Sequence, residues 1–414
     1  MKFLKALGFF GLLVVLWAFG FFWRDIQQGQ APSGRAVALA FGGPAKAALT
    51  PEQLFKQAFN RISNNFVRPV KTLELKYAGM EGLMASLGDP HTMFLVPKVA
   101  EDFALETRAN FVGIGARLGT DPLGAKIAVV FEDGPADKAG LQMNDVITSI
   151  DGVSYVGKDV DLMVSKIRGK EGTNVRLGVI KAGDNKATNF NVRRAKIITP
   201  TVTGNYLADS QIGHVTVPSF AEPTAEQFDR AIDKLSNKPL KGLVIDLRGN
   251  PGGLLETAVE MVSRFVEGKV VVTMKDRDGK RSSAVTPHGF VRDWPYPVVV
   301  LIDEDSASAA EIFAGALRDY RKVTLVGTHS YGKSSVQEVK ELIDGASAKI
   351  TIAKYFLPSA EDIGRKVDED GLYVSGGLHP QYNVTFDEDA VVVFGDPKKD
   401  PQLQKAIDVI LGKS

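Results

Sequence analysis

Lys333 lies in a stretch that could bind phosphate. Residues Gly327 to Ser335 read GTHSYGKSS, and the first eight fit the phosphate-loop pattern GxxxxGK[ST], in which the lysine contacts the phosphates of a nucleotide. A lysine can instead act as a general base if burial keeps its amine neutral, and it can then take the proton of a serine hydroxyl. The stretch is compatible with either chemistry, so residues elsewhere in the chain must decide.

The order of the motifs argues against a nucleotide site. The segment Val298 to Asp305 (VVVLIDED) imitates the hydrophobic strand whose terminal carboxylate holds magnesium in phosphate-loop enzymes. In those enzymes the loop follows the first strand and the acidic strand comes later, whereas here the acidic strand precedes the loop by about 25 residues. Eight-residue patterns of this looseness arise by chance.

Two further stretches would have no role in a nucleotide site. One is DLRGNPGG, Asp246 to Gly253, and the other is SASAAE, Ser306 to Glu311. Together with Lys333 and Gln337 they resemble the serine peptidase family of carboxyl-terminal processing, or tail-specific, proteases. The stretch Gly88 to Thr92 (GDPHT) is similar to a motif that precedes the PDZ domain of that family, so the resemblance extends over most of the chain.

The resemblance implies a serine–lysine catalytic pair. In the family the nucleophile is the central serine of the SAS run and the lysine follows it by 25 residues, which is the spacing from Ser308 to Lys333. It therefore assigns Ser308 as nucleophile and Lys333 as general base. Gln337, four residues after the lysine, would orient the amine by hydrogen bonding.

The same resemblance implies an oxyanion hole built from backbone N–H groups. Gly252 or Gly253, after the Asn-Pro turn, would supply one donor, and Ala309, beside the nucleophile, would supply the other. Small residues suit these positions because a bulky side chain would keep the substrate carbonyl away from the donors.

Each of these residues also has a purely structural interpretation. Ser308 to Glu311 is a good capping box for the helix EIFAGALRD, Asn250 to Gly253 could be an ordinary turn, and Lys333 could be an exposed lysine. Capping and catalysis are compatible, since the positive end of a helix dipole favours negative charge on an attacked carbonyl. The order and spacing of all three stretches favour catalysis.

Histidine and metal catalysis have less support. The sequence contains neither a GxSxG elbow nor an HExxH motif, and no histidine has a partner that the sequence identifies. We therefore expect no metal and no cofactor. The histidines considered for a Ser-His-Asp site are His91, His214, His288, His329 and His379.

A second domain is indicated by short β-type runs from about Asn110, which are separated by glycine. FVGIG, EDGPADKAGLQMNDVITSIDG and IRGKEGTNVRL resemble a PDZ domain of the bacterial protease-associated type. The resemblance implies that Gly113, Ile114 and Gly115 capture the C-terminal carboxylate of a peptide, which would add as a strand beside Ile114. The alternative is a β-rich domain with purely structural glycine turns.

The N-terminus predicts a membrane anchor. Lys2 and Lys5 precede 18 uncharged, overwhelmingly apolar residues, Ala6 to Trp23. As a helix this run would be roughly 27 Å long, near the lower limit for spanning a bilayer. A cleaved signal peptide is the alternative, but the first suitable small residues, Ala38 to Ala40, lie far downstream. We expect the lysines in the cytoplasm and the remainder exported.

Composition sets wider limits. A length of 414 residues predicts two or three domains, and 50 basic against 49 acidic residues do not indicate a nucleic-acid partner. The absence of cysteine excludes disulfides, thiolate metal sites and cysteine nucleophiles.

The predicted fold is a mixed α/β protease core, crotonase-like by resemblance, with an inserted PDZ domain. Thr50, Pro51 and Gln53 mark the start of a first helix, and a final amphipathic helix, a candidate docking or dimer element, starts at Asp400. In chain order the predicted parts are a membrane anchor (1–25), a flexible linker (26–49), a helical region (50–100), the PDZ domain (101–195), the protease core (196–390) and a C-terminal helical segment (391–414).

Taken together, these features predict a serine endopeptidase anchored in the inner membrane of a bacterium, with its catalytic part in the periplasm. It would cut proteins in or near their C-terminal regions, and the PDZ domain would bind free apolar C-termini and gate the site. A second copy or an adaptor protein is a further candidate partner. The competing hypothesis is a non-enzymatic scaffold whose whole function is PDZ binding.

Overall fold

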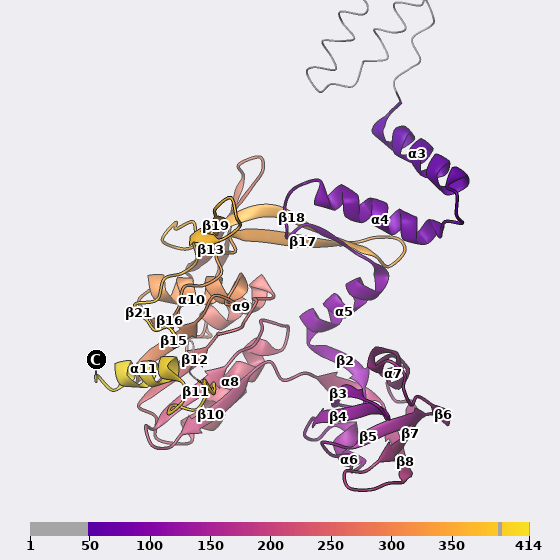
Figure 1. The fold of residues 1–414 in the computed structure, drawn as a ribbon. Helices are drawn as coiled ribbons and strands as arrows, with labels where there is room; N and C mark the ends of the chain where they lie inside the picture. The colour runs from indigo at the N-terminus through magenta and orange to yellow at the C-terminus, as the bar shows by residue number, and fades with distance from the viewer. Residues whose placement is uncertain (1–48, 388–390, 414) are drawn as a thin grey trace, which may run out of the picture. The chain divides into compact units, whose positions relative to one another are not determined.

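The computed structural model describes residues 49–387 and 391–413 (Figure 1). The chain divides into two compact units, residues 1–79 and 80–414. The predicted anchor and nearly all of the predicted linker lie outside the described residues. Within the described ranges, no helix is long and apolar enough to cross a bilayer.

The first unit contains helix α3 and most of helix α4. Helix α3 covers Pro51–Asn65 and starts as the sequence predicts. The Thr50 hydroxyl accepts a hydrogen bond from the Gln53 N–H at 3.3 Å, and the Gln53 side chain accepts one from the Thr50 N–H at 3.0 Å. Helix α4 covers Thr72–Ala85. No residue of α3 is buried, so its apolar face is exposed in this chain.

A six-stranded sheet in the second unit carries the three motifs that predict a catalytic site. Its strand order is β10-β11-β12-β15-β16-β21, and all neighbours run parallel except β10 and β11. Most residues of β11, β12, β15 and β16 are buried and apolar, as expected for a parallel sheet covered on both faces. The bounds are β10 Thr203–Leu207, β11 Ile212–Thr216, β12 Gly242–Asp246, β15 Val298–Ile302, β16 Thr324–Gly327 and β21 Tyr382–Asn383.

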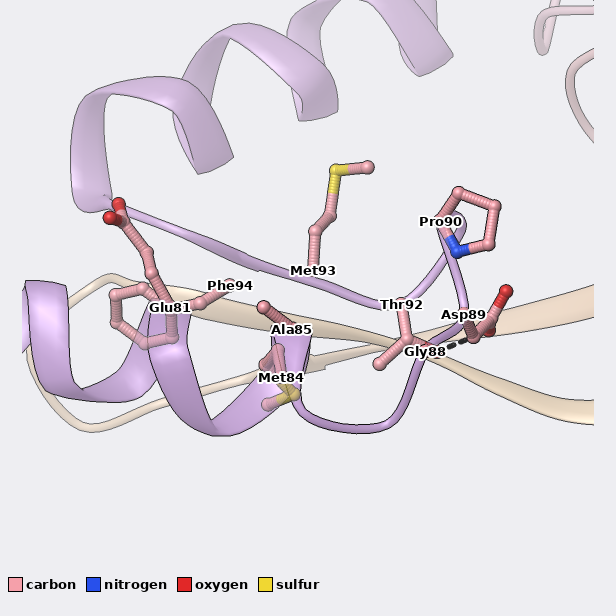
Figure 2. Close-up of a pocket in the computed structure, with 9 residues that line it drawn as sticks. All are labelled: Glu81, Met84, Ala85, Gly88, Asp89, Pro90, Thr92, Met93 and Phe94. Atoms are coloured by element: carbon pink, nitrogen blue, oxygen red, sulfur yellow. Dashed lines mark hydrogen bonds between the residues drawn. The ribbon is translucent and has the colours of Figure 1, made fainter. Parts of the chain in front are cut away.

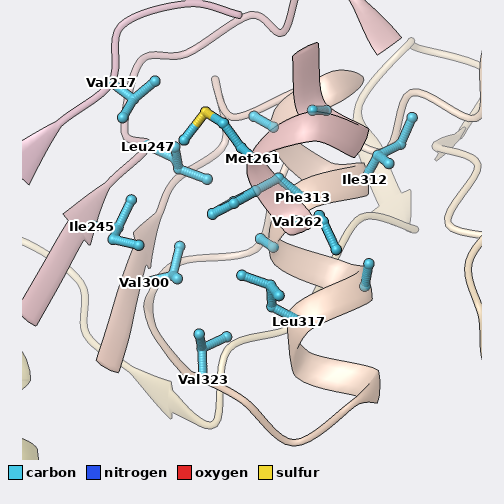
Figure 3. Packing of buried hydrophobic residues seen from close by; sticks show 14 of the residues in the cluster. Val217, Ile245, Leu247, Met261, Val262, Val300, Ile312, Phe313, Leu317 and Val323 are labelled. Atoms are coloured by element: carbon cyan, nitrogen blue, oxygen red, sulfur yellow. The ribbon is translucent and has the colours of Figure 1, made fainter. Parts of the chain in front are cut away.

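Helices pack on both faces of this sheet because successive strand residues point to opposite sides. Ile245 and Val300 pack against α8, α9 and α10, and Figure 3 shows Phe313 of α10 among them. Val244 and Val299 pack on the other face against α11. The helices are α8 Thr224–Ser236, α9 Leu255–Val262, α10 Ala309–Asp319 and α11 Pro401–Ile410.

Helix α11 is the amphipathic helix predicted to start at Asp400. Its apolar residues Leu403, Ile407 and Ile410 are buried against the sheet of the same chain. The apolar face that the sequence suggested as a docking or dimer element is therefore occupied by the protein's own core.

A second, antiparallel sheet has no counterpart among the elements expected from the sequence. Its order is β1-β18-β13-β14, and β17 pairs with β18. Strands β17 and β18 form a long ribbon, and β17 begins two residues after Lys333. The bounds are β1 Met93–Leu95, β13 Val270–Asp276, β14 Arg281–Val285, β17 Ser335–Glu341 and β18 Ser347–Phe356.

The segment predicted as a PDZ domain has its own sheet and core. The sheet order is β3-β4-β5-β7-β8 with β6 on β5, and β2 pairs separately with β9. A separate hydrophobic cluster that includes Ile127, Met163 and Leu177 fills its interior. Its elements are β2 Asn110–Gly113, β3 Ala116–Asp121, β4 Gly124–Val130, α6 Pro135–Lys138, β5 Val146–Ile150, β6 Val153–Ser154, α7 Val160–Ile167, β7 Asn174–Ile180, β8 Ala187–Arg193 and β9 Ala195–Ile198. Helix α5, Pro97–Arg108, precedes them.

Candidate active site

The three catalytic motifs follow three neighbouring parallel strands. The turn DLRGNPGG begins at the end of β12, SASAAE follows β15, and GTHSYGKSS begins at the end of β16. The carboxyl ends of parallel strands lie at one edge of a sheet, so the motifs meet there. Two backbone hydrogen bonds join the loops. The Ala307 N–H donates to the backbone oxygen of Asn250 at 2.9 Å, and the Tyr331 N–H donates to the backbone oxygen of Ser306 at 3.0 Å.

Ser308 is the N-cap residue of α10 and has an unusual backbone conformation. Its φ is 54° and its ψ is −116°, a region that costs a residue with a side chain about 1–3 kcal/mol. Such strain persists only where neighbouring contacts impose it, and it clusters at functional sites. Gly252 is one such neighbour, because a Cβ at Gly252 would lie 2.8 Å from the Cβ of Ser308.

The carboxylate of Glu311 joins the serine loop to the lysine loop. Its Oε2 accepts from the backbone N–H of Ser308 at 2.8 Å and from that of Lys333 at 2.9 Å. Its Oε1 accepts from the Gly332 N–H at 2.7 Å and from the Ser330 hydroxyl at 2.5 Å. Because one oxygen atom binds both, the backbone nitrogens of Ser308 and Lys333 are close neighbours.

Glu311 is fully buried, with 0 % of its surface exposed. Burial raises its pKa to about 7, although the four hydrogen bonds favour the charged form. Tyr355 is also buried. Its hydroxyl group donates a hydrogen bond to the backbone oxygen of Lys333, and its hydroxyl oxygen lies 3.5 Å from the backbone oxygen of Ser308. The sequence indicates Glu311 only as a helix cap and gives no signal for Tyr355.

Lys333 has the lowered pKa that a general base requires. Burial and the neighbouring Lys349 ammonium lower the pKa of Lys333 to about 8, while Glu311 and Asp89 act in the opposite direction. About a tenth of the amine is therefore neutral at pH 7, and about half at pH 8. An ordinary exposed lysine, with a pKa near 10.4, would be almost entirely charged.

The side chains of the proposed pair are not hydrogen-bonded to each other in this structure. Among the described residues, neither the Ser308 hydroxyl nor Gln337 forms a hydrogen bond with the Lys333 amine. Gln337 instead donates its amide hydrogens to the Ser335 hydroxyl at 2.8 Å and the Thr351 hydroxyl at 3.1 Å. Its carbonyl oxygen is the group left to accept from an amine.

The candidate oxyanion donors differ in their hydrogen bonding. The N–H of Gly252 donates to Asn250 Oδ1 at 2.8 Å and is therefore engaged. In the part of the chain that the structure describes, the N–H groups of Gly253 and Ala309 have no hydrogen-bond partner. Gly253 has a φ of 139°, and a Cβ there would lie 2.0 Å from the Phe220 oxygen, so only glycine fits.

The GDPHT stretch, which the sequence analysis used only as a mark of resemblance, lies near the lysine. Asp89 acts to raise the pKa of Lys333, and burial together with the charge of Lys333 lowers the pKa of His91. The imidazole of His91 packs edge-on toward the Tyr331 ring, with centroids 6.5 Å apart. The presence of a carboxylate and a histidine within five residues was the available signal, but no spacing rule connects it to position 333.

His214 does not form a conventional triad. Its Nε2 bonds Asp246 Oδ2 at 3.0 Å, but its Nδ1 is buried without a partner among the described residues, so no serine hydroxyl completes the set. Asp246 also bonds the buried Arg248. Burial alone would raise the pKa of Asp246, but the bonds from Arg248 and His214 lower it to about 2.

In the PDZ segment, Gly113 ends β2, and Ile114 and Gly115 follow it. The oxygens of Ile114 and Gly115 accept from the N–H groups of Ala136 and Phe131 at 2.7 and 2.9 Å. Their own N–H groups have no hydrogen-bond partner within the described residues. Two unengaged donors in succession, with Gly115 at a φ of 74°, suit the capture of a carboxylate.

Two family models match the chain. Residues 211–373 match peptidase family S41, and residues 126–181 match a PDZ domain. The match to the PDZ model lies in the segment with the separate hydrophobic cluster, and the match to the peptidase model includes the loops that carry Ser308 and Lys333.

Curated relatives carry the same family name. The carboxy-terminal processing protease CtpB of Bacillus subtilis (strain 168) is 36 % identical over 318 residues, which cover 75 % of this chain and 65 % of that protein. The carboxy-terminal processing protease CtpA of the same organism is 33 % identical over 358 residues, covering 86 % and 74 %. The chain spans slightly less than two thirds of the length of CtpB.

A solved structure, the photosystem II D1 C-terminal processing protease, aligns with a TM-score of 0.46 and 24 % identity over 87 % of this chain and 98 % of that one. The relationship to CtpA, 33 % identity over 74 % of its length, confirms the family resemblance read from the motifs. The chain belongs to peptidase family S41, the carboxy-terminal processing proteases, and contains a PDZ domain.

Proposed function

We propose that this chain is a serine endopeptidase that cuts proteins in or near their C-terminal regions, with Ser308 as nucleophile and Lys333 as general base. One observation carries the proposal: a single oxygen of the buried Glu311 accepts from the backbone N–H of both residues. Two motifs 25 residues apart are thereby held together. The lowered pKa of Lys333 supplies the base, and the N-terminus of α10 supplies a favourable site for developing negative charge.

The proposed reaction begins with the serine–lysine pair. As substrate enters, the Lys333 amine approaches the Ser308 hydroxyl and takes its proton, while Oγ bonds to the scissile carbonyl carbon. The carbonyl electron pair moves onto oxygen, where the N–H groups of Gly253 and Ala309 stabilise it. Collapse of this intermediate expels the amine, which takes the proton from Lys333 and leaves an acyl ester on Ser308.

Hydrolysis of the ester repeats the same steps with water. Lys333 takes a proton from the water, whose oxygen attacks the ester carbonyl, and Ser308 recovers the proton as it leaves. Gln337 can hold the amine in place through its carbonyl oxygen, because its amide hydrogens are already bound by Ser335 and Thr351. Gly252 acts by its lack of a side chain, which lets the turn approach Ser308.

The PDZ domain, in this proposal, binds the free apolar C-terminus of a substrate through Gly113, Ile114 and Gly115, and gates access to the site. The N-terminal apolar run, Ala6 to Trp23, anchors the chain in the bacterial inner membrane with the catalytic part in the periplasm. The competing proposal, a non-enzymatic scaffold, is disfavoured because Ser308 and Lys333 are both present and their backbones are held together by Glu311.

The test uses the full chain in detergent and its Ser308→Ala variant, each incubated without nucleotide with an unfolded protein that ends in apolar residues. Products are identified by mass spectrometry. We expect cleavage by the wild type and none by Ser308→Ala. Equal cleavage by both would overturn the nucleophile assignment, and binding of the substrate without cleavage by either would favour the scaffold.

A further inference from the structure

The segment between α4 and the PDZ domain contributes to the same site. Strand β1 pairs with β18, with Leu95 opposite Ser347 and Met93 opposite Lys349. This pairing brings the preceding residues, Asp89 to Thr92, alongside the centre of β18. Figure 2 shows Asp89 and Thr92 in the wall of a pocket of about 520 Å³, joined by a hydrogen bond.

Asp89 organises this segment through hydrogen bonds. Its Oδ2 accepts from the Thr92 hydroxyl at 2.6 Å, and its Oδ1 accepts from the His91 N–H at 3.1 Å. The Thr92 hydroxyl in turn accepts from the backbone N–H of Thr351 at 3.0 Å. Thr351 on β18 is thus held by this segment through its backbone N–H.

Thr351 passes this constraint to Gln337. The two residues are opposite each other in the β17–β18 ribbon, and the Gln337 amide donates to the Thr351 hydroxyl at 3.1 Å. The register of the ribbon shifts between Val336 and Gln337. Because such a bulge re-aims the side chains beside it, the direction of the Gln337 amide depends on its hydrogen bonds more than on strand geometry alone.

We propose that Asp89, Thr92 and Thr351 are positioning residues that hold Gln337 with its carbonyl oxygen toward the general base. The Thr92 hydroxyl donates to Asp89, so the Thr92 oxygen is free to accept from the Thr351 N–H, and this fixes the position of Thr351. The Thr351 oxygen accepts from an amide hydrogen of Gln337, and the Gln337 oxygen is left for the amine. This chain of hydrogen bonds from Asp89 through Thr92 and Thr351 to Gln337 is called the relay below. The relay rests on the proposed function, because it acts through Lys333.

The same segment sets the charge around Lys333. Four charged or titratable groups interact electrostatically with this amine. They are Asp89 and His91 before β1, Lys349 on β18, and Glu311 on α10. The Asp89 carboxylate raises the pKa of Lys333, against the lowering caused by burial and Lys349. Loss of the Asp89 charge should therefore lower the pKa of Lys333 and increase the neutral fraction of the amine at lower pH.

The principal test compares Thr351→Val with Thr351→Ser in the full chain. Valine keeps the shape of the side chain but cannot accept from Gln337, whereas serine keeps the hydroxyl. We expect Thr351→Val to lower kcat at least roughly tenfold with KM little changed, and Thr351→Ser to retain most of the activity. Thr273→Val, a half-buried threonine on β13 of the same sheet, is the matched control and should leave kcat unchanged.

A second variant keeps the proposal testable if Thr351→Val folds poorly. Asp89→Asn should move the rising limb of the kcat/KM profile to lower pH and also lower the plateau. A wild type that cleaves nothing would overturn the proposed function and the relay with it. A wild type that cleaves, with Ser308→Ala inactive but Thr351→Val and Asp89→Asn like the wild type, would overturn the relay alone. Equal losses in Thr351→Val and Thr351→Ser would also overturn it.

Discussion

In its charged form, which predominates above its pKa of about 7, the carboxylate of Glu311 carries no hydrogen and accepts from four donors. In Glu311→Gln, one of the two oxygens becomes an NH₂ group. In either orientation of the amide, at least one backbone N–H of the site then loses its acceptor. An unsatisfied buried donor costs about 1–3 kcal/mol, and here the loss falls on the loops that carry Ser308 and Lys333.

We therefore expect Glu311→Gln to lower kcat roughly ten- to hundredfold with little change in KM. Steady-state kinetics on a protein substrate would measure this, with circular dichroism to show that the variant is folded. Glu256→Gln, at an exposed position in the first turn of α9, is the matched control. A folded Glu311→Gln variant with wild-type kcat would show that the carboxylate is not needed to hold the pair.

The pKa of Lys333 predicts the pH dependence of activity. The neutral amine is the active form, so kcat/KM should rise as pH rises through about 8. The Lys349 ammonium helps to lower this pKa, since two nearby cations disfavour each other. In Lys349→Met that repulsion is absent, the pKa of Lys333 should be higher, and the rising limb should move to higher pH.

The control for Lys349→Met is Lys354→Met, an exposed lysine on the same strand that does not act on Lys333. A pH profile of kcat/KM over about three units around pH 8 would detect the shift. If Lys349→Met left the limb in place, Lys333 would not be the group that titrates. Asp89→Asn is expected to shift the limb in the opposite direction, which makes the pair of variants a stringent check.

Among the elements, helix α11 is joined to the catalytic turn by a buried ion pair. Arg248 follows β12, and its guanidinium donates to both carboxylate oxygens of Asp400 at 2.8 and 2.7 Å. Asp400 also caps α11 by accepting from the Leu403 N–H at 3.1 Å. Both charged side chains are almost fully buried, and Arg248 also pairs with the buried Asp246. Asp400 therefore depends on Arg248 for compensation of its charge, whereas Arg248 has two carboxylate partners.

Removal of Asp400 leaves the charge of Arg248 compensated by Asp246, but the guanidinium hydrogens that bound Asp400 and the Leu403 N–H lose their acceptor. We expect Asp400→Ala to lower the free energy of unfolding by about 1–3 kcal/mol, measured by denaturant titration. Asp408→Ala on the same helix, where the carboxylate bonds only the exposed Gln404 side chain, should change it by less than about 1 kcal/mol. Similar decreases in the free energy of unfolding in the two variants would show that the ion pair does not stabilise the packing of α11 against the sheet.

The elements that carry the motifs could be predicted from the sequence because local signals determine them. Continuous apolar runs predicted β12, β15 and β16, and caps at Thr50 and Asp400 predicted where α3 and α11 begin. Strand β17 reads SVQEVKE and has no fully buried residue, so its pattern does not mark it as part of a sheet. Its pairing with β18 depends on the tertiary structure.

The contacts that complete the site could not be predicted for the same reason. Glu311 has a clear local role as a helix cap, and nothing in its neighbourhood of the sequence indicates that it also binds the loop of Lys333. Thr351 lies in no motif, and Asp89 is more than 240 residues from Lys333 in the sequence. Motif spacing therefore predicted the groups that are proposed to react, whereas the contacts that hold them are seen only in the three-dimensional structure.

At the scale of the whole molecule, peptide binding and cleavage are assigned to parts with separate hydrophobic cores. The unengaged N–H groups of Ile114 and Gly115 belong to one part, and Ser308 and Lys333 belong to the other. If both proposals hold, binding should survive the loss of the nucleophile. Binding should also depend on whether the C-terminus of the substrate is a free carboxylate.

Peptides that are identical except for a free carboxylate or an amide at the C-terminus provide the test. We expect the Ser308→Ala chain to bind the free-carboxylate form at least roughly tenfold more tightly, because a charged acceptor on backbone N–H groups is worth more than a neutral one. Fluorescence anisotropy with labelled peptides would measure this. For the wild type, amidation of a long substrate should lower kcat/KM by a similar factor, while short peptides that do not engage the PDZ domain should be cut equally in both forms. Equal affinity for the two peptides would remove the carboxylate-binding role of Gly113 to Gly115 and leave the catalytic assignment unaffected.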